Sequence, residues 1–367
     1  MPNRKNVFLI GAGASAHTGA PVMSNFLRAA LNLLDSEVLT GEDAQRFKRI
    51  ISYRNAHDAV EQKAGFDLTN IEDVFGLIEI DCRVDKSATV LRDDLIFLIL
   101  KTLEQTIREE DPDHTVCQIN VQTASGARSQ ERKQSVSGHF VDIVSRRWEQ
   151  RPQNGICKDS IISLNYDLIL ERTMAVKGLR PLYRLDPRPN PVHTDEIAVW
   201  LLKLHGSANW AICSNPSCET VQVLPIEAAT VSGIESSKCT CGSAMKPFIV
   251  PPTWSKGEHG VALQNVWRSA FEELVTARRW VFIGSSLAPT DLFLRYLLAL
   301  ALQRNKDLDR IVVIDNGEKG TGYDQMFQNY PKRMVFTRNR SSFQETVASG
   351  TLQYALGQIM ATVDPAW

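Results

Sequence analysis

The sequence lacks any long uninterrupted apolar segment. Its most apolar stretch, residues 291–302, contains Asp291 and Arg295 and is shorter than the ~20 residues that a membrane-spanning helix needs. Near the N-terminus, the apolar run from Val7 to Ile10 is well below the ~7–15 residues of an export signal. The sequence therefore predicts a cytoplasmic protein without a membrane segment, in which residues 291–302 form a buried helix.

The sequence also lacks an excess of charge and any internal repeat. Its 41 lysines and arginines nearly balance its 42 aspartates and glutamates, so the formal net charge is -1. Binding to nucleic acid without sequence preference relies on a basic surface, so the composition gives no direct signal for a nucleic-acid partner. With 367 residues, the chain is long enough for one large domain or two smaller ones.

Short apolar runs that end in polar or small residues predict a parallel sheet. The runs are residues 7–10, 160–167, 199–206, 280–287 and 310–317. Parallel strands bring their C-terminal ends to one edge of the sheet, where α/β proteins bind their ligands. The pattern therefore predicts an α/β protein with a Rossmann-like parallel sheet and a ligand crevice along that edge.

Two segments do not fit this sheet. Residues 24–140 are interpreted as a helical insertion, with apolar residues at helical spacing to about residue 118 and a polar loop over 119–137. Residues 211–246 carry four clustered cysteines. We therefore expect one domain over residues 1–367, interrupted by a helical insertion and by a small cysteine-bearing module.

A glycine turn follows the first predicted strand. Gly11, Gly13 and Ala16 match the pattern G-x-G-x-x-A, which predicts a strand-to-helix turn whose backbone N–H groups face a phosphate. A nicotinamide dehydrogenase would continue with a second strand and an acidic residue about 20 positions on. This chain enters a long helical segment instead, so a dehydrogenase is disfavoured. A tight turn without a ligand is the alternative.

Two later strand ends favour a nucleotide as the ligand. Asp315 follows the last predicted strand and is suited to accept hydrogen bonds from ribose hydroxyls. Residues 284–287, Gly-Ser-Ser-Leu, supply a second glycine turn with hydroxyl and backbone donors. The two glycine turns and Asp315 are predicted to meet at one edge of the sheet. Together they favour a nucleotide site more than any one of them does alone.

Other polar and aromatic residues are assigned to structure and not to chemistry. Glu72, Asp73 and Glu79 are expected on a solvated helix face, so we give them no catalytic role. Tyr166 and Trp210 are expected in the core or in the wall of a pocket.

Four of the seven cysteines predict a metal site. They form two close pairs separated by 20 residues, Cys213 with Cys218 and Cys239 with Cys241. Clustered cysteines in a cytosolic chain point to metal ligation before disulfides, and four thiolates suit tetrahedral Zn²⁺. Because four protein ligands leave no position for water, the zinc would be structural. Four free cysteines in a surface loop are the alternative, disfavoured because exposed thiols oxidise readily.

Four of the segments, taken in order, resemble the sirtuin signatures. They are GAGASAHTGAP at 11–21, SLNYD at 163–167, KLHG at 203–206 and GSSL at 284–287. Sirtuins also carry a cysteine cluster between the last two motifs. The motifs extend to residue 316, so the resemblance spans most of the chain. It implies a sirtuin-like fold with NAD as the ligand and a zinc-ribbon module over 211–246.

The resemblance implies a role for individual residues of this sequence. Asn165 and His205 would be catalytic, with Asn165 beside the nicotinamide ribose and His205 acting on the ribose hydroxyls. The residues implied to hold NAD are Gly11, Ala12, Gly13 and Ser15 at the phosphates, Asp167 near Asn165, and Gly284, Ser285, Ser286, Asp315 and Asn316 at the adenosine half. Histidine exchanges protons near neutral pH, which suits this role. The alternative for His205 is a strand-end histidine bonded to backbone.

The chain departs from protein-deacylating sirtuins on the peptide-binding side. Val22-Met23-Ser24 replaces an Asp-Phe-Arg segment, and Leu164 stands where those enzymes have glutamine. Residues 249–257 replace a Phe-Gly-Glu segment, and Pro251 and Pro252 there have no N–H to pair with an added peptide strand. The residues implied to hold NAD are kept. This pattern looks like the bacterial sirtuin-like NAD hydrolases of anti-phage defence systems.

The resemblance therefore implies an NAD⁺ glycohydrolase that releases nicotinamide and ADP-ribose and acts by depleting NAD⁺. An NAD-dependent protein deacylase and a non-enzymatic sensor of NAD or ADP-ribose are the alternatives. A homo-oligomer or a complex with a defence partner, such as a HerA-type ATPase or a short Argonaute, is expected, since a toxic hydrolase must be restrained. The helical insertion is where such contacts would lie.

Overall fold

The fold of the protein is given by a computed structural model. It describes residues 5–110, 116–123, 126–133, 135–145, 155–186, 192–193, 196–250, 260–288, 291–314, 322–327 and 335–339, together with residues 347 and 352.

Seven parallel strands form the main sheet, in the order β12-β11-β10-β1-β4-β6-β5. Their bounds are β1 Asn6–Ile10, β4 Ser160–Ser163, β5 Leu179–Leu182, β6 Ile197–Lys203, β10 Arg279–Ile283, β11 Arg310–Ile314 and β12 Val335–Asn339. Every pairing in this sheet is parallel. The predicted α/β fold with a Rossmann-like parallel sheet is confirmed.

The N-terminal strand β1 lies at the centre of the sheet. Its last residue, Ile10, pairs with Ile283 of β10 on one side and with Ser163 of β4 on the other. From β1 the chain passes to β4, then to the edge strand β5 and back to β6 between them, and it then crosses to the other side of β1 through β10, β11 and β12. In α/β sheets this reversal of strand order opens a crevice at the carboxyl ends of the strands.

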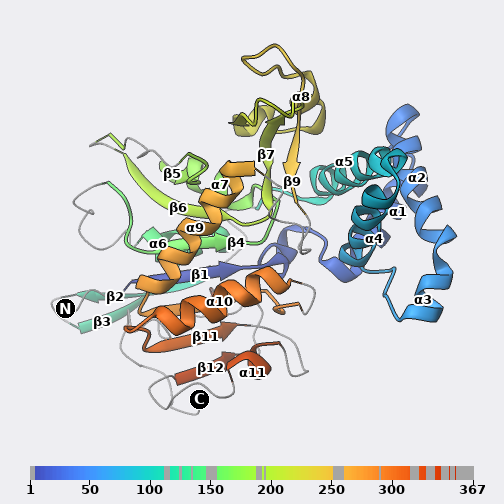
Figure 1. The fold of residues 1–367 in the computed structure, drawn as a ribbon. Helices are drawn as coiled ribbons and strands as arrows, with labels where there is room; N and C mark the ends of the chain where they lie inside the picture. The colour runs from blue at the N-terminus through green and yellow to red at the C-terminus, as the bar shows by residue number, and fades with distance from the viewer. Residues whose placement is uncertain are drawn as a thin grey trace.

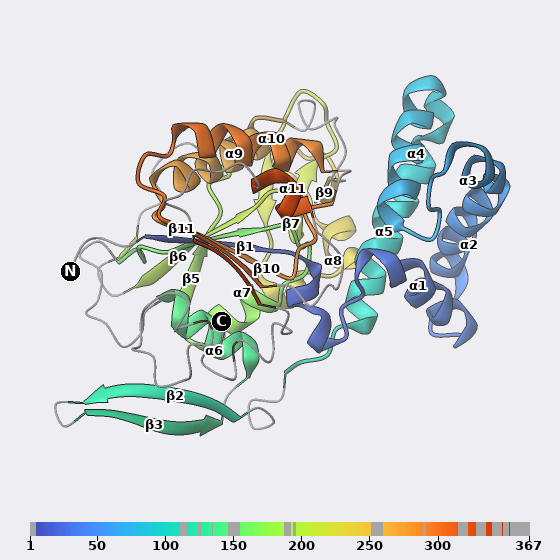
Figure 2. The same cartoon turned by 90° about the horizontal axis from the view of Figure 1, so that it is seen from below.

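Helices cover both faces of the sheet, which explains why its central strands are buried along their whole length. All residues of β1 and β10 are buried, as expected for parallel strands between two helical layers. Figure 2 shows α9 (Gly260–Thr276), α10 (Leu292–Arg304) and α11 (Gly322–Phe327) on one face, and α6 (Val136–Ser145) and α7 (Ile169–Val176) on the other. Helix α10 is the helix predicted for residues 291–302. It buries one face, through Leu294 and Leu298, and exposes Tyr296.

Five helices form a separate cluster beside the sheet (Figure 1). They are α1 Phe26–Asp35, α2 Gly41–Ala56, α3 Asp58–Ala64, α4 Ile71–Val84 and α5 Thr89–Thr106, and we call them the helical cluster. Phe47, Phe75 and Leu98 are fully or almost fully buried among them. The cluster thus has an apolar core of its own, apart from the core around the main sheet.

The prediction of a loop over residues 119–137 is wrong. The chain there forms an antiparallel hairpin of β2 (Val116–Thr123) and β3 (Gly126–Lys133), and α6 follows from Val136. Backbone hydrogen bonds define such a ribbon, so a pattern of apolar side chains does not indicate it. Helix α6 packs on the sheet, where Phe140 meets Phe8 edge to face at 5.4 Å between ring centroids.

The cysteine-bearing module is a second, smaller sheet. Its strands β7 (Gly206–Cys213), β8 (Val221–Val223) and β9 (Met245–Ile249) pair antiparallel in the order β8-β7-β9, and helix α8 (Val231–Ser236) packs on β9. Two ion pairs join the module to the helical cluster, Arg46 with Glu235 at 3.0 Å and Lys246 with Asp93 at 2.9 Å. None of the helices in the described part of the chain combines the length and the hydropathy that a bilayer crossing requires.

Candidate functional site

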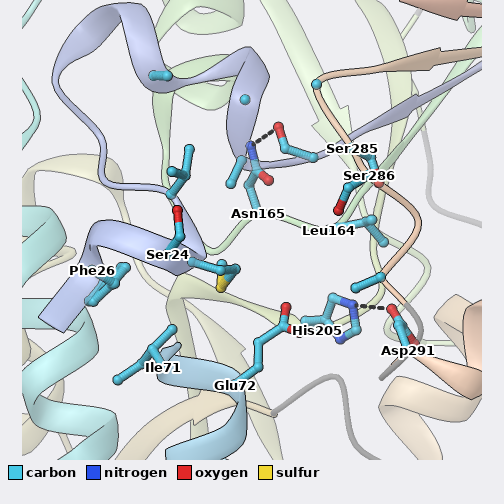
Figure 3. Close-up of a pocket in the computed structure, with 18 of the residues that line it drawn as sticks. Ser24, Phe26, Ile71, Glu72, Leu164, Asn165, His205, Ser285, Ser286 and Asp291 are labelled. Carbon is cyan, nitrogen blue, oxygen red and sulfur yellow. Dashed lines mark hydrogen bonds and ion pairs between the residues drawn. The ribbon is translucent and has the colours of Figure 1, made fainter. Parts of the chain in front are cut away.

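A pocket of about 790 Å³ opens at the carboxyl ends of the central strands. Segments that follow four strands line it: Gly11, Ala12 and Gly13 after β1, Leu164, Asn165 and Tyr166 after β4, His205 after β6, and Gly284, Ser285 and Ser286 after β10. The last residue of β11, Ile314, reaches it as well. The structure therefore brings most of the predicted site residues into one cavity at the switch point of the sheet (Figure 3).

The two glycine turns are packed directly against each other. A Cβ added to Gly11 would lie 2.7 Å from the Gly284 oxygen, and one added to Gly284, whose φ is +61°, would lie 2.2 Å from the Ala14 nitrogen. The Gly11 N–H donates to the Ile283 oxygen at 3.0 Å, and the Gly13 N–H donates to the Gly284 oxygen at 2.8 Å. These glycines allow two backbone segments to approach closely at the floor of the pocket.

The expectation that the N–H groups of this turn face a phosphate is therefore wrong for Gly11 and Gly13. Both amides donate to backbone oxygens within the protein. The G-x-G pattern could not reveal this, because the partner turn at Gly284 lies more than 270 residues further along the chain. The glycines shape the floor of the pocket, and polar contacts to a ligand must come from other groups that line it.

Asn165 is held rigidly by three hydrogen bonds. Its side-chain nitrogen donates to the Gly11 oxygen at 3.1 Å and to the Ser15 hydroxyl at 3.0 Å, and its backbone N–H donates to the Ser163 hydroxyl at 3.1 Å. Because a carbonyl only accepts, the atom facing Gly11 must be the amide nitrogen. The side-chain oxygen of Asn165 is then the group of this amide that is turned to other partners.

Ser15 and Asp167 lie behind Asn165 and do not line the pocket. The Ser15 hydroxyl donates to the Asp167 carboxylate at 2.8 Å and accepts from Asn165. The other oxygen of this carboxylate accepts the Ile169 N–H at 3.1 Å, at the start of α7. A direct contact of Ser15 with a phosphate in this pocket, as the resemblance implies, does not fit this placement. Both residues instead fix the position of Asn165.

A buried ion pair between Lys203 and Glu171 holds the loop of residues 165–167 in place. The Lys203 ammonium lies 2.8 Å from Glu171 and also donates to the backbone oxygens of Tyr166 and Asp167, at 3.5 and 2.5 Å. Both side chains of the pair are almost fully buried. Burial raises the pKa of the Glu171 carboxyl, while the charge of Lys203 acts in the opposite direction. The pair thus anchors the 165–167 loop to β6.

His205 meets a carboxylate that the sequence did not indicate as functional. Its Nε2 lies 3.1 Å from the Asp291 carboxylate, and the two residues are 3% and 4% exposed. The backbone oxygen of His205 accepts the Val250 N–H at 2.8 Å. A carboxylate bonded to Nε2 fixes the orientation of the ring and stabilises its protonated form, and it leaves Nδ1 as the acceptor of the neutral ring. His205 therefore fits a role in proton transfer.

Asp291 is also the N-cap of α10. Its other carboxylate oxygen accepts the Leu294 N–H at 3.2 Å. The sequence carries one signal that points to this residue, since an aspartate directly before an apolar helix is a typical N-cap. That signal predicts the cap but not the contact with His205.

The helical cluster closes the other side of the pocket. The lining residues from it and from the segment that leads into it are Val22, Met23, Ser24, Phe26, Asn70, Ile71, Glu72, Phe75 and Ile99. Val22, Met23 and Ser24 are the residues that differ from protein-deacylating sirtuins, and Leu164, another such difference, lines the pocket too. Tyr166 donates its hydroxyl to the Val250 oxygen at 2.9 Å, and Trp210 is fully buried, so both are wall or core residues as predicted.

The expectation of a solvated face is wrong for two of the three acidic residues of α4. Glu79 is buried and paired with Arg92 at 2.6 Å, and Glu72 lines the pocket (Figure 3). Asp73 is partly exposed and accepts the Asp67 N–H at 2.9 Å. The amphipathic pattern assumes that one face of a helix meets solvent, whereas α4 packs against α5 and also borders the pocket.

The four predicted metal ligands lie together, away from the pocket. The sulfur atoms of Cys213, Cys218, Cys239 and Cys241 all lie within 4.8 Å of one another. Two of the separations are 3.5 and 3.6 Å, from Cys213 to Cys241 and from Cys218 to Cys239. Four sulfurs at 2.3 Å from a tetrahedral zinc would be about 3.8 Å apart, so the group could hold a metal ion.

Several predicted residues lie outside the part of the chain that the structure describes. They are Asp315 and Asn316, expected at the adenosine half of NAD, and Pro251 and Pro252, expected to oppose pairing with a peptide.

Comparison with known proteins gives matches among solved structures alone. No protein-family model matches the chain, and no curated protein matches it. One similar chain is Sir2Tm bound to a propionylated peptide, with 15% identity, a TM-score of 0.42, and coverage of 97% of this chain and 94% of that one. Another comes from a study of the mechanism and regulation of Sir2 enzymes, with 14% identity, a TM-score of 0.45, and the same coverage.

A third similar chain is a Sir2 homologue variant in complex with ADP ribose. It shares 15% identity at a TM-score of 0.43, with coverage of 97% of this chain and 95% of that one. The solved chains to which this protein is similar in these three cases are thus Sir2 chains, at sequence identities of 14–15%.

Proposed function

We propose that the protein is an NAD⁺ glycohydrolase, which cleaves NAD⁺ with water to nicotinamide and ADP-ribose. The observation that carries the proposal is the convergence of a fixed amide, Asn165, and a carboxylate-paired imidazole, His205, on one cavity at the switch point of the sheet. The motifs that surround these residues resemble those of sirtuins, whose ligand is NAD.

In the proposed binding mode, the adenosine half and the nicotinamide half of NAD⁺ lie at the carboxyl ends of different strands. We place the adenosine half near Gly284, Ser285 and Ser286, and we propose that Asp315 and Asn316, which follow β11 in the sequence, bind it as well. The close-packed turns at Gly11–Gly13 let the pyrophosphate approach the backbone. The nicotinamide ribose then lies between Asn165 and His205, which line the same cavity.

Cleavage requires heterolysis of the bond between C1′ of the ribose and the nicotinamide nitrogen. The bonding electrons pass to the pyridinium ring, which leaves as neutral nicotinamide, and positive charge develops on the ribose. The amide oxygen of Asn165 is fixed by its hydrogen-bonded nitrogen, so it can position a water or the ribose without reorganisation. His205, oriented by Asp291, accepts the proton released as the water adds to C1′.

Water, and not an acylated peptide, is the proposed acceptor because of what lines the pocket. Side chains of the helical cluster, among them Phe26, Ile71 and Phe75, line the same pocket as Asn165 and His205. The residues that differ from the peptide-binding segments of deacylases, Val22 to Ser24 and Leu164, belong to the same lining. This lining supports hydrolysis over transfer to a peptide.

We assign Zn²⁺ to the four-cysteine group, in a structural role. Four thiolates leave no open coordination position, and none of the four cysteines lines the pocket. When bound, the ion would cross-link the two loops of the module that contains β7 and β9. The cysteine module thus contributes to the reaction indirectly, because its strands β7 and β9 hold the backbone at His205 in position.

The cellular role that we propose is depletion of NAD⁺ in anti-phage defence in the cytoplasm, as the motif resemblance implies. Such a hydrolase must be restrained until it is triggered, so we propose a homo-oligomer or a complex with a defence partner such as a HerA-type ATPase. The helical cluster is the proposed contact region, because its residues also line the pocket. Light-scattering mass measurements of the chain, alone and with a candidate partner, test this part.

The test of the function is release of nicotinamide from NAD⁺ by the purified chain, with and without an acetyl-lysine peptide. We expect release without peptide and ADP-ribose as the co-product. Release that strictly requires the peptide, with an acylated ADP-ribose as product, would overturn the proposal in favour of a deacylase. Binding of NAD⁺ without any release would overturn it in favour of a sensor.

A further inference from the structure

Glu72 is a carboxylate that the helical cluster delivers to the pocket. It is the second residue of α4, and the side chain of the N-cap Asn70 accepts its backbone N–H at 3.0 Å. Its neighbours Ile71 and Phe75 are 3% and 2% exposed and lock the first turn of α4 in place. The side chain of Glu72 is half-buried and points into the cavity on the side of His205 (Figure 3).

The end of the pocket that holds His205 is negatively charged. Among the lining residues in the described part of the chain, the ionisable ones are Glu72, Asp291, Tyr166 and two histidines, and no lysine or arginine is present. One of these histidines, His17, lies 2.6 Å from Glu110. Burial, and then the charges of Glu72 and Asp291, raise the pKa of the Tyr166 phenol, which lines the same pocket.

The negative charge near His205 suits the nicotinamide end of the proposed substrate, NAD⁺. The nicotinamide ring of NAD⁺ is a cation, whereas the reduced nicotinamide ring of NADH is neutral and ADP-ribose lacks the nicotinamide. As the bond to C1′ breaks, the positive charge moves from the ring to the ribose, so it stays at this end of the molecule. A fixed carboxylate in a partly dehydrated cavity stabilises such a charge more strongly than water would.

We propose that Glu72 contacts the substrate, selects the cationic nicotinamide ring of NAD⁺, and stabilises the positive charge that passes to the ribose during cleavage. This inference rests on the proposed function and deepens it. It gives the helical cluster a chemical role, because the cluster supplies one of the acidic groups of the site.

The test compares Glu72→Gln with Asp73→Asn. Both substitutions remove one acidic charge from the first turn of α4 while keeping the size of the side chain, but Asp73 does not line the pocket. Each variant is assayed for nicotinamide release from NAD⁺ and for binding of NAD⁺, NADH and ADP-ribose by calorimetry.

We expect Glu72→Gln to lower kcat by roughly 10–1000-fold, in the range seen when one stabilising group is removed from a site. It should also reduce the preference for NAD⁺ over NADH and leave ADP-ribose binding within about twofold of wild type, a change of less than half a kcal/mol. Asp73→Asn should behave as wild type in all these measurements.

Unchanged turnover and an unchanged NAD⁺ to NADH binding ratio in Glu72→Gln would overturn the inference while leaving the hydrolase intact. An equal loss in both variants would overturn it too, because the charge would then act through the helix dipole. If wild type binds NAD⁺ without cleaving it, and Glu72→Gln alone loses the preference over NADH, the hydrolase fails and the recognition by Glu72 stands.

Discussion

Asp291 joins the N-terminus of helix α10 to the imidazole of His205. One oxygen of its carboxylate accepts the Leu294 N–H at 3.2 Å, and the other lies 3.1 Å from Nε2 of His205. The residue thus ties a structural element to a side chain of the site. One substitution can remove the contact with His205 and keep the helix cap, whereas another removes both. The contribution of Asp291 to turnover can therefore be measured apart from its contribution to stability.

We predict that Asp291→Asn leaves the fold intact and impairs turnover. Asparagine is as good an N-cap as aspartate, so α10 keeps its cap. The neutral amide does not stabilise a protonated His205, so kcat for nicotinamide release should fall by roughly 10²–10⁴-fold. The dependence of kcat on pH should change as well, which a purely structural role would not produce.

Asp291→Ala is the matched variant for this prediction. It removes the cap as well as the contact with His205, so it should cost about 1 kcal/mol of unfolding free energy beyond Asp291→Asn. If Asp291→Asn shows the kcat and the pH profile of wild type, the pairing with His205 has no role in the reaction.

Ser15→Ala tests the network behind Asn165. The hydroxyl of Ser15 accepts from the Asn165 amide and donates to Asp167, so its loss leaves buried polar groups unsatisfied. We expect a loss of about 1–3 kcal/mol of unfolding free energy and a fall in turnover as Asn165 becomes mobile. Asn165→Ala should fold, keep its bound metal and lose most turnover. Ser15→Ala with wild-type turnover would exclude a positioning role.

Gly284→Ala should disrupt the floor of the pocket. The new Cβ would lie 2.2 Å from the backbone nitrogen of Ala14 at a φ of +61°. Gly178→Ala is the control, since Gly178 has a similar φ of +69° but no heavy atom within 4 Å of an added Cβ. Positive φ costs both variants about 1–2 kcal/mol, and the clash should cost Gly284→Ala a further ~1–3 kcal/mol. Equal thermal midpoints of the two variants would contradict the close packing of the turns.

Removal of the proposed zinc should impair the pocket, which the four cysteines do not line. Strand β7 runs from Gly206, directly after His205, to Cys213, and the residue after β9, Val250, bonds to the backbone of His205. We expect Cys218→Ser to lose zinc by elemental analysis, several kcal/mol of unfolding free energy, and part of the turnover. The stability loss should remain below the ~10–16 kcal/mol of isolated zinc fingers, because the module also packs on the helical cluster.

Cys82→Ser is the control for this experiment. Cys82 is a buried cysteine of α4 outside the four-cysteine group, so its replacement should leave the metal content unchanged. Full turnover of metal-free Cys218→Ser would show that β7 and β9 hold His205 without the ion.

Sequence reasoning located the residues at the strand ends but not those that meet them from elsewhere. Asn165, His205 and Ser285 each follow a predicted strand, and the geometry of parallel sheets brings such positions together. Asp291 and Glu72 reach the same cavity from helix N-termini. Their position depends on how α10 and the helical cluster pack, and no local pattern in the sequence encodes that packing.

The role of the glycines illustrates the same limit. The G-x-G turn was correctly placed after the first strand, but its amides donate to a turn that lies far away in the sequence. Likewise, the hairpin of β2 and β3 is defined by backbone pairing, which composition does not report. Local periodicity predicts elements, whereas the assignment of a backbone donor requires the tertiary structure.

The central position of β1 has a consequence for biosynthesis. This strand is synthesised before both of its neighbours in the sheet, which lie at residues 160–163 and 279–283. A ribosome-bound chain cannot bury β1 on both sides, pack Gly11 against Gly284, or pair His205 with Asp291 until the chain has emerged as far as Asp291. Such long-range pairing slows folding, since distant segments must first meet. The proposed hydrolase activity therefore requires residues 160–291 to be synthesised and folded onto β1, so it is expected to be absent from shorter nascent chains.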